Sequence, residues 1–428
     1  MFMKILMIAI IGALAAIMSN KGIAVFNDGL RPIMPEYLEG RMNRKELAAT
    51  AFAMGFGLVI GFGIPFSLTT SIILIHSIFL GTDIIGTFCP DNKKGTIISI
   101  IIGALYGVGI VTGLEGIVKA FEKLPVNFMD SLGLVGAPIV VAFAVFPALA
   151  TAYQYGAKKG LLNLIISLVV RQIAVAINPI NMGSAAINLN PEGMALVAGM
   201  IVLMVYATRE KVEEDTVDLS SVFGQRVEKI KENIVILMIM GGLVAAATSL
   251  NYVAGDPISL NLAGEGKYVD AGFAALARGI GFIPLIVSTT IATGVYGPVG
   301  MTFIFAIGFF IKNPIISFIV GAAVMGLEVL LLGKIGHSMD KYPGIREAGD
   351  NIRNAMSKLL EVALLVGGMN AANAIAPGMG FFIVAGLYIL NEISGKPVVS
   401  MAVGPISAIL VGILANLLSL IGLFNIPA

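Results

Sequence analysis

Tryptophan is absent from this chain of 428 residues, and cysteine, histidine and charged residues are scarce. Without tryptophan, any aromatic belt at a membrane surface must come from tyrosine and phenylalanine. The single cysteine, Cys89, excludes an internal disulfide and a metal site built from cysteines. The two histidines, His76 and His337, follow no zinc-ligand spacing, so we expect neither a metal nor a cofactor. The formal net charge of +1 gives no reason to expect nucleic acid as a partner.

Apolar residues dominate instead. They make up 57% of the chain against 12% charged residues, with a mean hydropathy of +0.94, whereas a soluble domain carries about 25% charged residues. A helix needs about 20 mostly apolar residues to cross a bilayer, and such stretches follow one another throughout. We therefore predict an all-α polytopic membrane protein with the lipid bilayer as a partner. The 51 glycines suit helices that approach closely in lipid.

Hydropathy and chain-breaking residues indicate about fourteen apolar segments. Several are short or interrupted by glycine and proline, so we expect some to be broken or re-entrant rather than full spans. The first also has features of a secretory signal, an alternative that the internal repeat described below disfavours. The segments lie near residues 3–20, 46–65, 67–89, 95–118, 131–154, 160–177, 193–208, 233–254, 271–292, 296–311, 314–336, 358–376, 378–392 and 398–424.

Lysine and arginine are distributed unevenly between the loops. The loops after odd-numbered segments carry most of them, including Arg31 and Arg41 after the first. Because cytoplasmic loops are enriched in these residues, we predict that both termini are extracytoplasmic. The most polar stretch, 209–232, is interpreted as a cytoplasmic linker with a short helix. It separates a first transmembrane repeat, 1–208, from a second one, 233–428.

Three collinear matches relate the two halves. The first has seven identities in sixteen positions, the second shares an Ala-x-Ala-x-Gly-x-Gly string, and the third has five identities in seven. Chance similarity between apolar segments is the alternative, but three matches in order favour a repeat. The matched pairs are 5–20 with 236–251, 51–57 with 275–281, and 98–104 with 316–322, at offsets of 231, 224 and 218 residues.

An offset of seven spans would place the two halves in opposite orientation. Seven-plus-seven inverted repeats are a transporter architecture, in which solute binds near the midplane where broken helices of the two repeats meet. If the halves exchange conformations, an outward-open state becomes an inward-open one. A purely structural membrane protein has no comparable need for inversion.

Ionisable side chains in mid-membrane cost at least about 2.5–3.5 kcal/mol, so each needs a reason. Arg278 lies in the ninth segment and Glu328 in the eleventh, where the two could pair. Asp83 lies in the third segment. In a functional interpretation, Arg278 holds an anionic group of the solute, and Glu328 or Asp83 accepts a coupling proton or sodium ion. The alternative is a structural ion pair inside the helix bundle.

Hydroxyl residues follow prolines at equivalent places in the two halves. A helix broken at these prolines would leave free backbone groups and hydroxyls along a cavity. The alternative is that the hydroxyls bond back to their own helix. Besides Arg278, the predicted solute-binding residues are Ser67, Thr69 and Thr70 after Pro65, Thr289, Thr290 and Thr293 after Pro284, and Asn370 and Asn373, which need partners if buried.

Two loops, 27–36 and 340–354, are dense in Asn, Asp, Gly and Pro. Each is either a cytoplasmic gate or an ordinary capped turn, and capped turns are the commoner case. No enzyme signature accompanies them: a Walker loop, His-Glu-x-x-His and Gly-x-Ser-x-Gly are all absent from the sequence. We therefore do not expect an enzyme.

Several strings spread over the whole chain are distinctive. In these strings the sequence resembles the YhfT family of bacterial inner-membrane proteins. The resemblance implies a location in the bacterial cytoplasmic membrane and a group regarded as transporters, and it supplies neither a substrate nor a catalytic residue. The strings are Ala24 to Ile33, Glu39-Gly40, Met42 to Arg44, Arg278 to Ile286, Ala292 to Tyr296, Asp350 to Met356 and Glu361 to Gly367.

We therefore expect a secondary transporter for a small polar solute, with an anionic group on that solute accounting for Arg278. The nearest variant is a phosphotransferase-type sugar permease, which a phosphorylating partner protein would distinguish. A membrane scaffold or assembly subunit without transport is the alternative from another class. Analogy with other inverted-repeat carriers predicts a homodimer.

Overall fold

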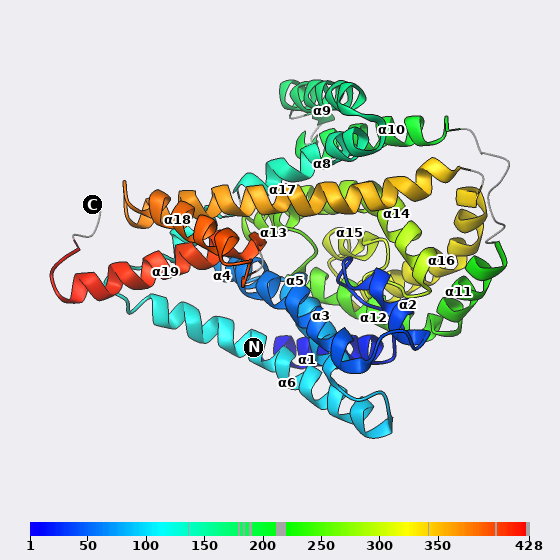
Figure 1. Cartoon of the computed structure of the whole chain (residues 1–428), viewed down its shortest axis with the longest axis horizontal. Coiled ribbons are helices and arrows are strands. Elements are labelled where there is room, and N and C mark those ends of the chain that lie inside the picture. Colours follow the sequence, from blue (N-terminus) through cyan, green and yellow to red (C-terminus); the bar gives the residue numbers. More distant parts are fainter. Residues whose placement is uncertain are drawn as a thin grey trace.

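The computed structural model describes residues 1–135, 137–178, 180–182, 185–187, 191–210, 220–340, 342–398 and 400–424. Within these ranges the chain is almost entirely helical (Figure 1). The first half contains α1 (Phe2–Asn20), the 3-10 helix η1 (Arg31–Ile33), α2 (Met34–Leu38), α3 (Arg44–Leu58), the π-helical turn η2 (Val59–Gly63), α4 (Ile64–Thr70), β1 (Ile73–Leu74), α5 (Ile75–Phe88), α6 (Lys93–Phe121), α7 (Met129–Gly133), α8 (Ala137–Tyr155), α9 (Ala157–Ile177), β2 (Ile180–Met182), β3 (Ala185–Ile187) and α10 (Pro191–Ala207).

The second half begins with a short amphipathic helix that lies in the predicted linker. Its elements are α11 (Ser220–Glu232), α12 (Ile234–Ser249), β4 (Val253–Ala254), α13 (Pro257–Gly264), α14 (Tyr268–Thr293), α15 (Phe303–Phe310), α16 (Pro314–Asp340), α17 (Pro343–Ile375), α18 (Gly380–Ile393) and α19 (Ser400–Leu420). Linker residues 211–219 lie outside the described ranges.

Six of the described helices are long and apolar enough to cross a membrane, and up to eight spans result if each of two bent helix pairs counts as one. Three further apolar helices, α5, α10 and α18, are shorter. The chain is therefore a helical protein with several helices able to span a bilayer. The predicted fourteen segments are more numerous, because some of them correspond to helices too short to cross, such as the eight-residue α15.

Glycine contacts hold the long helices together in pairs. On α1 and α6, Gly12 and Gly103 lie backbone to backbone, and Ala16 packs against Gly103. On α12 and α16, Gly321 lies against Gly241 in the same way, with Ala245 beside it. A side chain at these glycines would separate the helices, so small residues allow the close packing that apolar helices need in lipid.

One helix in each half departs from a regular α-helix near a proline, where the sequence predicted a break. In the first half, η2 interrupts the run from α3 to α4 just before Pro65. In the second half, α14 bends by 50° between Ile283 and Leu285. Both helices then end at a residue in the left-handed conformation, Ser71 after α4 and Gly294 after α14, which allows the chain to turn sharply.

The residues after these breaks pair with the other half of the chain. β1 runs parallel to β4, with Ile73 opposite Val253. Tyr296, which follows α14, forms a parallel bridge with Ala24, which follows α1. Each half thus contributes one segment after its first helix and one after its broken helix. These two crossed pairs tie the halves together at the centre of the molecule.

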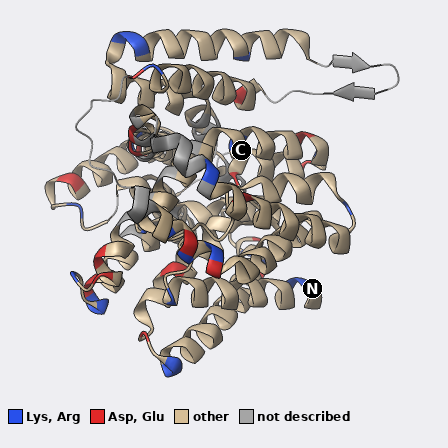
Figure 2. Ribbon diagram, turned by 90° about the vertical axis from the view of Figure 1, so that its right-hand side faces the viewer, with Lys and Arg blue, Asp and Glu red and all other residues tan. Residues whose placement is uncertain are grey.

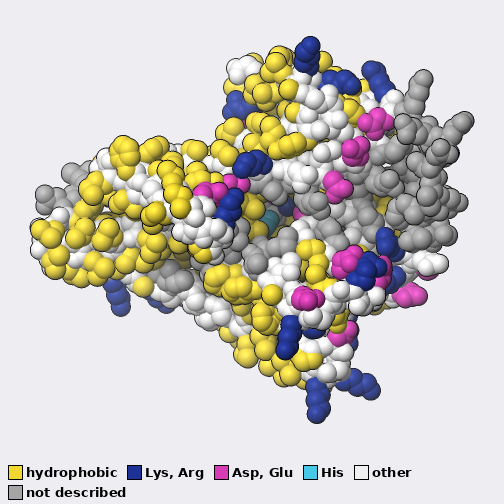
Figure 3. Space-filling view, viewed as in Figure 1, with side chains coloured by type: hydrophobic (Ala, Val, Ile, Leu, Met, Phe, Trp, Pro, Cys, Tyr) yellow, Lys and Arg dark blue, Asp and Glu magenta, His cyan; other side chains and the backbone are white. Residues whose placement is uncertain are grey.

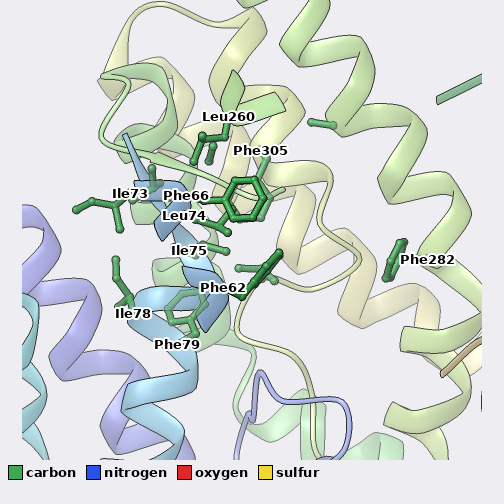
Figure 4. Close-up of a cluster of buried hydrophobic side chains, with 14 of the residues drawn as sticks. Phe62, Phe66, Ile73, Leu74, Ile75, Ile78, Phe79, Leu260, Phe282 and Phe305 are labelled. Carbon is green, nitrogen blue, oxygen red and sulfur yellow. The ribbon is translucent and has the colours of Figure 1, made fainter. Parts of the chain in front are cut away.

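The main hydrophobic cluster surrounds these pairings. In Figure 4, Phe66, Leu74 and neighbouring residues of the first half lie beside Leu260 and Phe305 of the second. Farther out, α8 packs on α9 and α10, α17 packs on α18 and α19, and α8 packs against α17. In Figure 1, α17 lies between the group formed by α8, α9 and α10 and the helices of the chain's first quarter.

Apolar side chains also cover much of the outer surface. In the most apolar 18-residue stretch of α9, only 22% of the residues are buried inside the protein. Figure 2 shows that charged residues gather mostly at helix ends and in loops, and Figure 3 shows wide hydrophobic areas on the described surface. Such a surface suits contact with lipid rather than with water.

One predicted loop is a helix instead. Residues 343–354 form the first turns of the 33-residue α17, which begins with Pro343 at its N-terminus. The density of Asp, Asn and Arg there suggested a turn, but proline is well placed in the first turn of a helix. Lys341 lies outside the described ranges.

Candidate functional site

A cavity of about 720 Å³ lies where elements of both halves meet. Polar residues reach it from the loop between α1 and η1, from α5, and from α14. The loop that follows α14 contributes backbone at Gly297 and Gly300, and α17 and α19 contribute apolar side chains. Figure 3 shows a hollow at the centre of this face of the molecule, with charged side chains around it. We take this cavity as the candidate functional site.

Asp83 on α5 shapes the loop that lines the cavity. Its two carboxylate oxygens accept hydrogen bonds from the backbone N–H groups of Phe26 at 3.2 Å and Asn27 at 2.8 Å. The side chain is only 3% exposed and is not among the lining residues. Asp83 therefore holds the loop against α5, so that Asn27 and the residues after it face the cavity.

Arg31 fixes the other end of this loop. It is 2% exposed, it bonds the carbonyl of Val25 through Nε and Nη2, and its Nη2 lies 3.0 Å from a carboxylate oxygen of Asp28. Its Nη1 donates to the hydroxyl of Thr289, beyond the bend of α14, at 2.8 Å. The positive charge of Arg31 is therefore compensated within the loop itself.

Arg278 lines the cavity on the other side of the bend and is 9% exposed. Its guanidinium lies over the ring of Phe282, 4.9 Å from the centroid. Among the described residues, its Nε is buried without a hydrogen-bond partner. A buried cation is costly unless an anion or several acceptors surround it, so Arg278 is the residue of this cavity most suited to a ligand.

His76 is a cavity residue that the sequence did not single out. Its ring makes edge-to-face contacts with Phe26 at 4.9 Å and Phe62 at 5.0 Å between centroids. In the described part of the chain, its Nδ1 is buried without a hydrogen-bond partner. The ring therefore presents an aromatic surface and one unused polar atom beside the cavity.

The sequence suggested that Glu328 could pair with Arg278, but in the structure it bonds other groups. One of its carboxylate oxygens accepts bonds from the hydroxyl of Tyr296 at 2.9 Å and from the N–H of Met301 at 2.7 Å. Its other oxygen has no hydrogen-bond partner within the described ranges. Glu328 thus holds the 297–302 loop, which lines the cavity, much as Asp83 holds the loop of the first half.

The predicted hydroxyl residues have mixed positions. Thr289 receives the bond from Arg31 and also donates to the carbonyl of Leu285 at 2.8 Å, which is the back-bonding alternative. Thr290 is fully buried, and its hydroxyl has no partner among the described residues. Thr293 bonds the N–H of Val295 at the end of α14. Of these three, Thr289 is hydrogen-bonded to two residues that line the cavity, Arg31 and Leu285.

In the first half, Ser67 accepts from the N–H of Leu74 at 2.9 Å and contacts the hydroxyl of Ser77 at 3.1 Å. Thr69 and Thr70 line a second cavity of about 470 Å³, together with residues of α13. These three residues therefore do not join Arg278 in the larger cavity. Thr70 bonds the N–H two residues ahead, as Thr293 does at the end of α14.

Asn370 and Asn373 are exposed on α17, and neither lines the larger cavity. Asn373 accepts from the N–H of Gly378 in the turn before α18. The cavity residues that sequence reasoning missed are Asn27, Asp28, Arg31 and His76. The density of special residues in 27–36 was the available signal for the first three, and His76 had no local signal.

Within the described ranges, no group of three or more His, Cys, Asp or Glu side chains could hold a metal ion. No solved structure matches the chain.

Comparison with known sequences gives two matches along nearly the full length. A family model described as "YhfT: Protein of unknown function" matches residues 4–424. The "Uncharacterized protein YhfT" of Escherichia coli (strain K12) is 37% identical over 445 residues, which cover 100% of both chains. The chain therefore belongs to the YhfT family.

Proposed function

We propose that this protein is a secondary transporter that carries a small polar solute across the bacterial cytoplasmic membrane by alternating access. The observation that carries the proposal is the buried Arg278, whose Nε has no hydrogen-bond partner among the described residues, in a cavity of about 720 Å³ lined by elements of both halves. A scaffold would have no reason to keep a buried arginine with an unused donor at that place, because burying such a group lowers stability.

The crossed pairings support a two-fold relation between the halves. Ala24 of the first half pairs with Tyr296 of the second, and Ile73 of the first pairs with Val253 of the second. If each half contains one copy of the same unit, these are one contact made twice with the roles exchanged. A symmetric pair of units is what alternating access by exchange of conformations requires.

Helix packing also supports a two-fold relation between the halves, but it aligns α1 with α12 at a different offset from the one that the sequence identities gave. Gly12 and Ala16 pack on Gly103 as Gly241 and Ala245 pack on Gly321, so that α1 corresponds to α12 at an offset of 241 − 12 = 229 residues. The string of identities gave 231, two residues more. The α6–α16 offset, 321 − 103 = 218, equals the sequence offset. In apolar helices local identity is a weak guide to register, because several alignments share alanine and glycine.

The remaining helices fit seven elements in each half. α8, α9 and α10 form one group of three, and α17, α18 and α19 form another. If each half crosses the membrane an odd number of times, the second unit is inverted relative to the first, with both termini extracytoplasmic under the positive-inside rule. In this proposal Asp83 and Glu328 are the coupling carboxylates, since protonation of either would release a loop that lines the cavity.

The proposal can be tested without knowledge of the solute. Leu360 on α17 lines the cavity, and the single natural thiol, Cys89, is buried. We would replace Cys89 by Ala and Leu360 by Cys, and treat right-side-out and inside-out vesicles with a membrane-impermeant thiol reagent. Alternating access predicts labelling from both sides.

Labelling from one side only would contradict the proposal and favour the scaffold. An exposed position such as Phe2→Cys, in the same Cys89→Ala background, serves as the control for vesicle orientation. A thermal-stability screen of the parent and Arg278→Ala against anionic metabolites and sugars would then identify the solute class.

A further inference from the structure

We propose that the ligand of the larger cavity is an amphipathic monocarboxylate, that is, one carboxylate group on an aliphatic or aromatic body. This inference rests on the proposed function and narrows its solute. Two independent features of the cavity carry it: the guanidinium of Arg278, which forms no ion pair within the described part of the chain, and a wall that is apolar over most of its extent.

The charge of the lining residues points to a single negative group. The charged side chains that line the cavity are Asp28, Arg31 and Arg278. Arg31 and Asp28 form an ion pair at 3.0 Å. Asp256 and Asp28 act on Arg278 only from beyond ion-pair distance, so its guanidinium remains open to a negative group of a ligand. A second negative group on the ligand would face Asp28 without a cation of its own, so a dicarboxylate is disfavoured.

The side chain of Arg278 is suited to a carboxylate. The guanidinium offers parallel N–H donors that match the two oxygens of a carboxylate. Its contact with Phe282 at 4.9 Å limits its rotation. The buried Nε without a partner is one donor that such a ligand would satisfy.

The rest of the wall suits an apolar body. α17 and α19 contribute only apolar side chains to the cavity, namely Met356, Leu360, Leu364 and Met401. Phe62 and Phe282 add aromatic rings. A sugar or another wholly polar solute would leave its hydroxyls without hydrogen bonds against this wall, which is costly. A volume of about 720 Å³ also leaves room for an apolar body beside the carboxylate.

The test is a thermal-stability titration of the full-length protein in detergent with butanoate, hexanoate and octanoate. Octanamide, which has the same body without the charge, and octanedioate, which has a second carboxylate, are the matched probes. We expect the affinity to rise about fourfold for each added CH₂ that becomes buried. Octanamide and octanedioate should give at least tenfold weaker binding.

Variants distinguish binding of octanoate at this site from its unspecific partition into the detergent. Arg278→Gln should abolish the octanoate shift and Arg278→Lys should keep part of it, because lysine keeps the charge without the fork. Arg171→Gln is the matched control, since Arg171 pairs with Glu192 on α9 and α10 and does not line the cavity. Asp28→Asn should admit octanedioate, because it releases the charge of Arg31.

Octanoate binding that survives in Arg278→Gln, or that octanamide equals, would overturn the inference. So would stabilisation by a sugar or a short dicarboxylate in place of the monocarboxylates. None of these outcomes affects the proposed function, which fails separately if the cysteine at position 360 is labelled from one side only. Protection of that cysteine by octanoate would support the inference.

Discussion

Arg31 donates a hydrogen bond to the hydroxyl of Thr289 at 2.8 Å, across 258 residues of sequence. The bond joins the loop after the first helix to α14 beyond its bend, and both segments border the cavity. It also explains why a buried arginine is tolerated in that loop: every direction of its guanidinium meets an acceptor.

We expect Arg31→Met to destabilise the protein by about 2–4 kcal/mol, because it leaves Asp28 without its cation and removes bonds to Val25 and Thr289. Thr289→Val removes the bond from Arg31 and the back-bond to Leu285, and should cost about 1–2 kcal/mol. Thermal unfolding in detergent measures both. Equal stability of Arg31→Met and the parent would show that the loop is not held by this residue.

Arg278→Gln, in contrast to Arg31→Met, should affect ligand binding and not stability. Its guanidinium has a ring beneath it but no acid within ion-pair distance in the described part of the chain, so its removal should leave stability unchanged or raise it by up to about 1 kcal/mol. Solute-dependent stabilisation should disappear. A large loss of stability would instead give Arg278 a structural role.

Variants of Glu328 and Tyr296 test whether Glu328 binds the coupling ion or only holds its loop. If Glu328 accepts the coupling ion, Glu328→Gln should bind solute but no longer respond to a proton or sodium gradient in liposomes. Tyr296→Phe removes the neighbouring 2.9 Å bond while keeping the carboxylate, so it should keep the coupling. If gradient-driven uptake persists in Glu328→Gln, Glu328 only holds its loop. Asp83→Asn is tested in the same way.

Gly103 and Gly109 of α6 provide a test site and its control for helix packing. Gly103 lies against the backbone of Gly12, whereas an added Cβ at Gly109 would meet no atom within 4 Å. Gly103→Ala should therefore separate α1 from α6 at a cost of about 1–3 kcal/mol. Gly109→Ala should be neutral or stabilising by up to about 1 kcal/mol. Equal melting temperatures for the two variants would contradict the packing.

The predicted topology can be tested with single cysteines in the Cys89→Ala background. Phe2 is 74% exposed at the N-terminus, and Lys45 is exposed at the start of α3. An impermeant thiol reagent should label Phe2→Cys in intact spheroplasts and Lys45→Cys only after lysis. The reverse pattern would place the N-terminus in the cytoplasm.

The sequence by itself determined the class of protein and the places where helices break. The apolar segments and the scarcity of charge predict a helical membrane protein, because a bilayer requires long apolar helices. Pro65 and Pro284 predicted interruptions, since proline removes a backbone donor and clashes with the preceding turn. Pro65 follows a π-helical turn, and Pro284 lies at the 50° bend of α14. Arg278 was also predictable, as an ionisable residue in an apolar segment.

Only the tertiary structure decided which polar residues share the cavity. Arg31 and Asp28 looked like ordinary turn residues, and Glu328 was expected to meet Arg278 rather than Tyr296. Asn370 and Asn373 were predicted to bind the solute, but both are exposed and neither lines the cavity. The physical reason is that local pattern reports a helix and its apolar face, whereas the partner of a buried polar group is chosen by contacts between segments far apart in sequence.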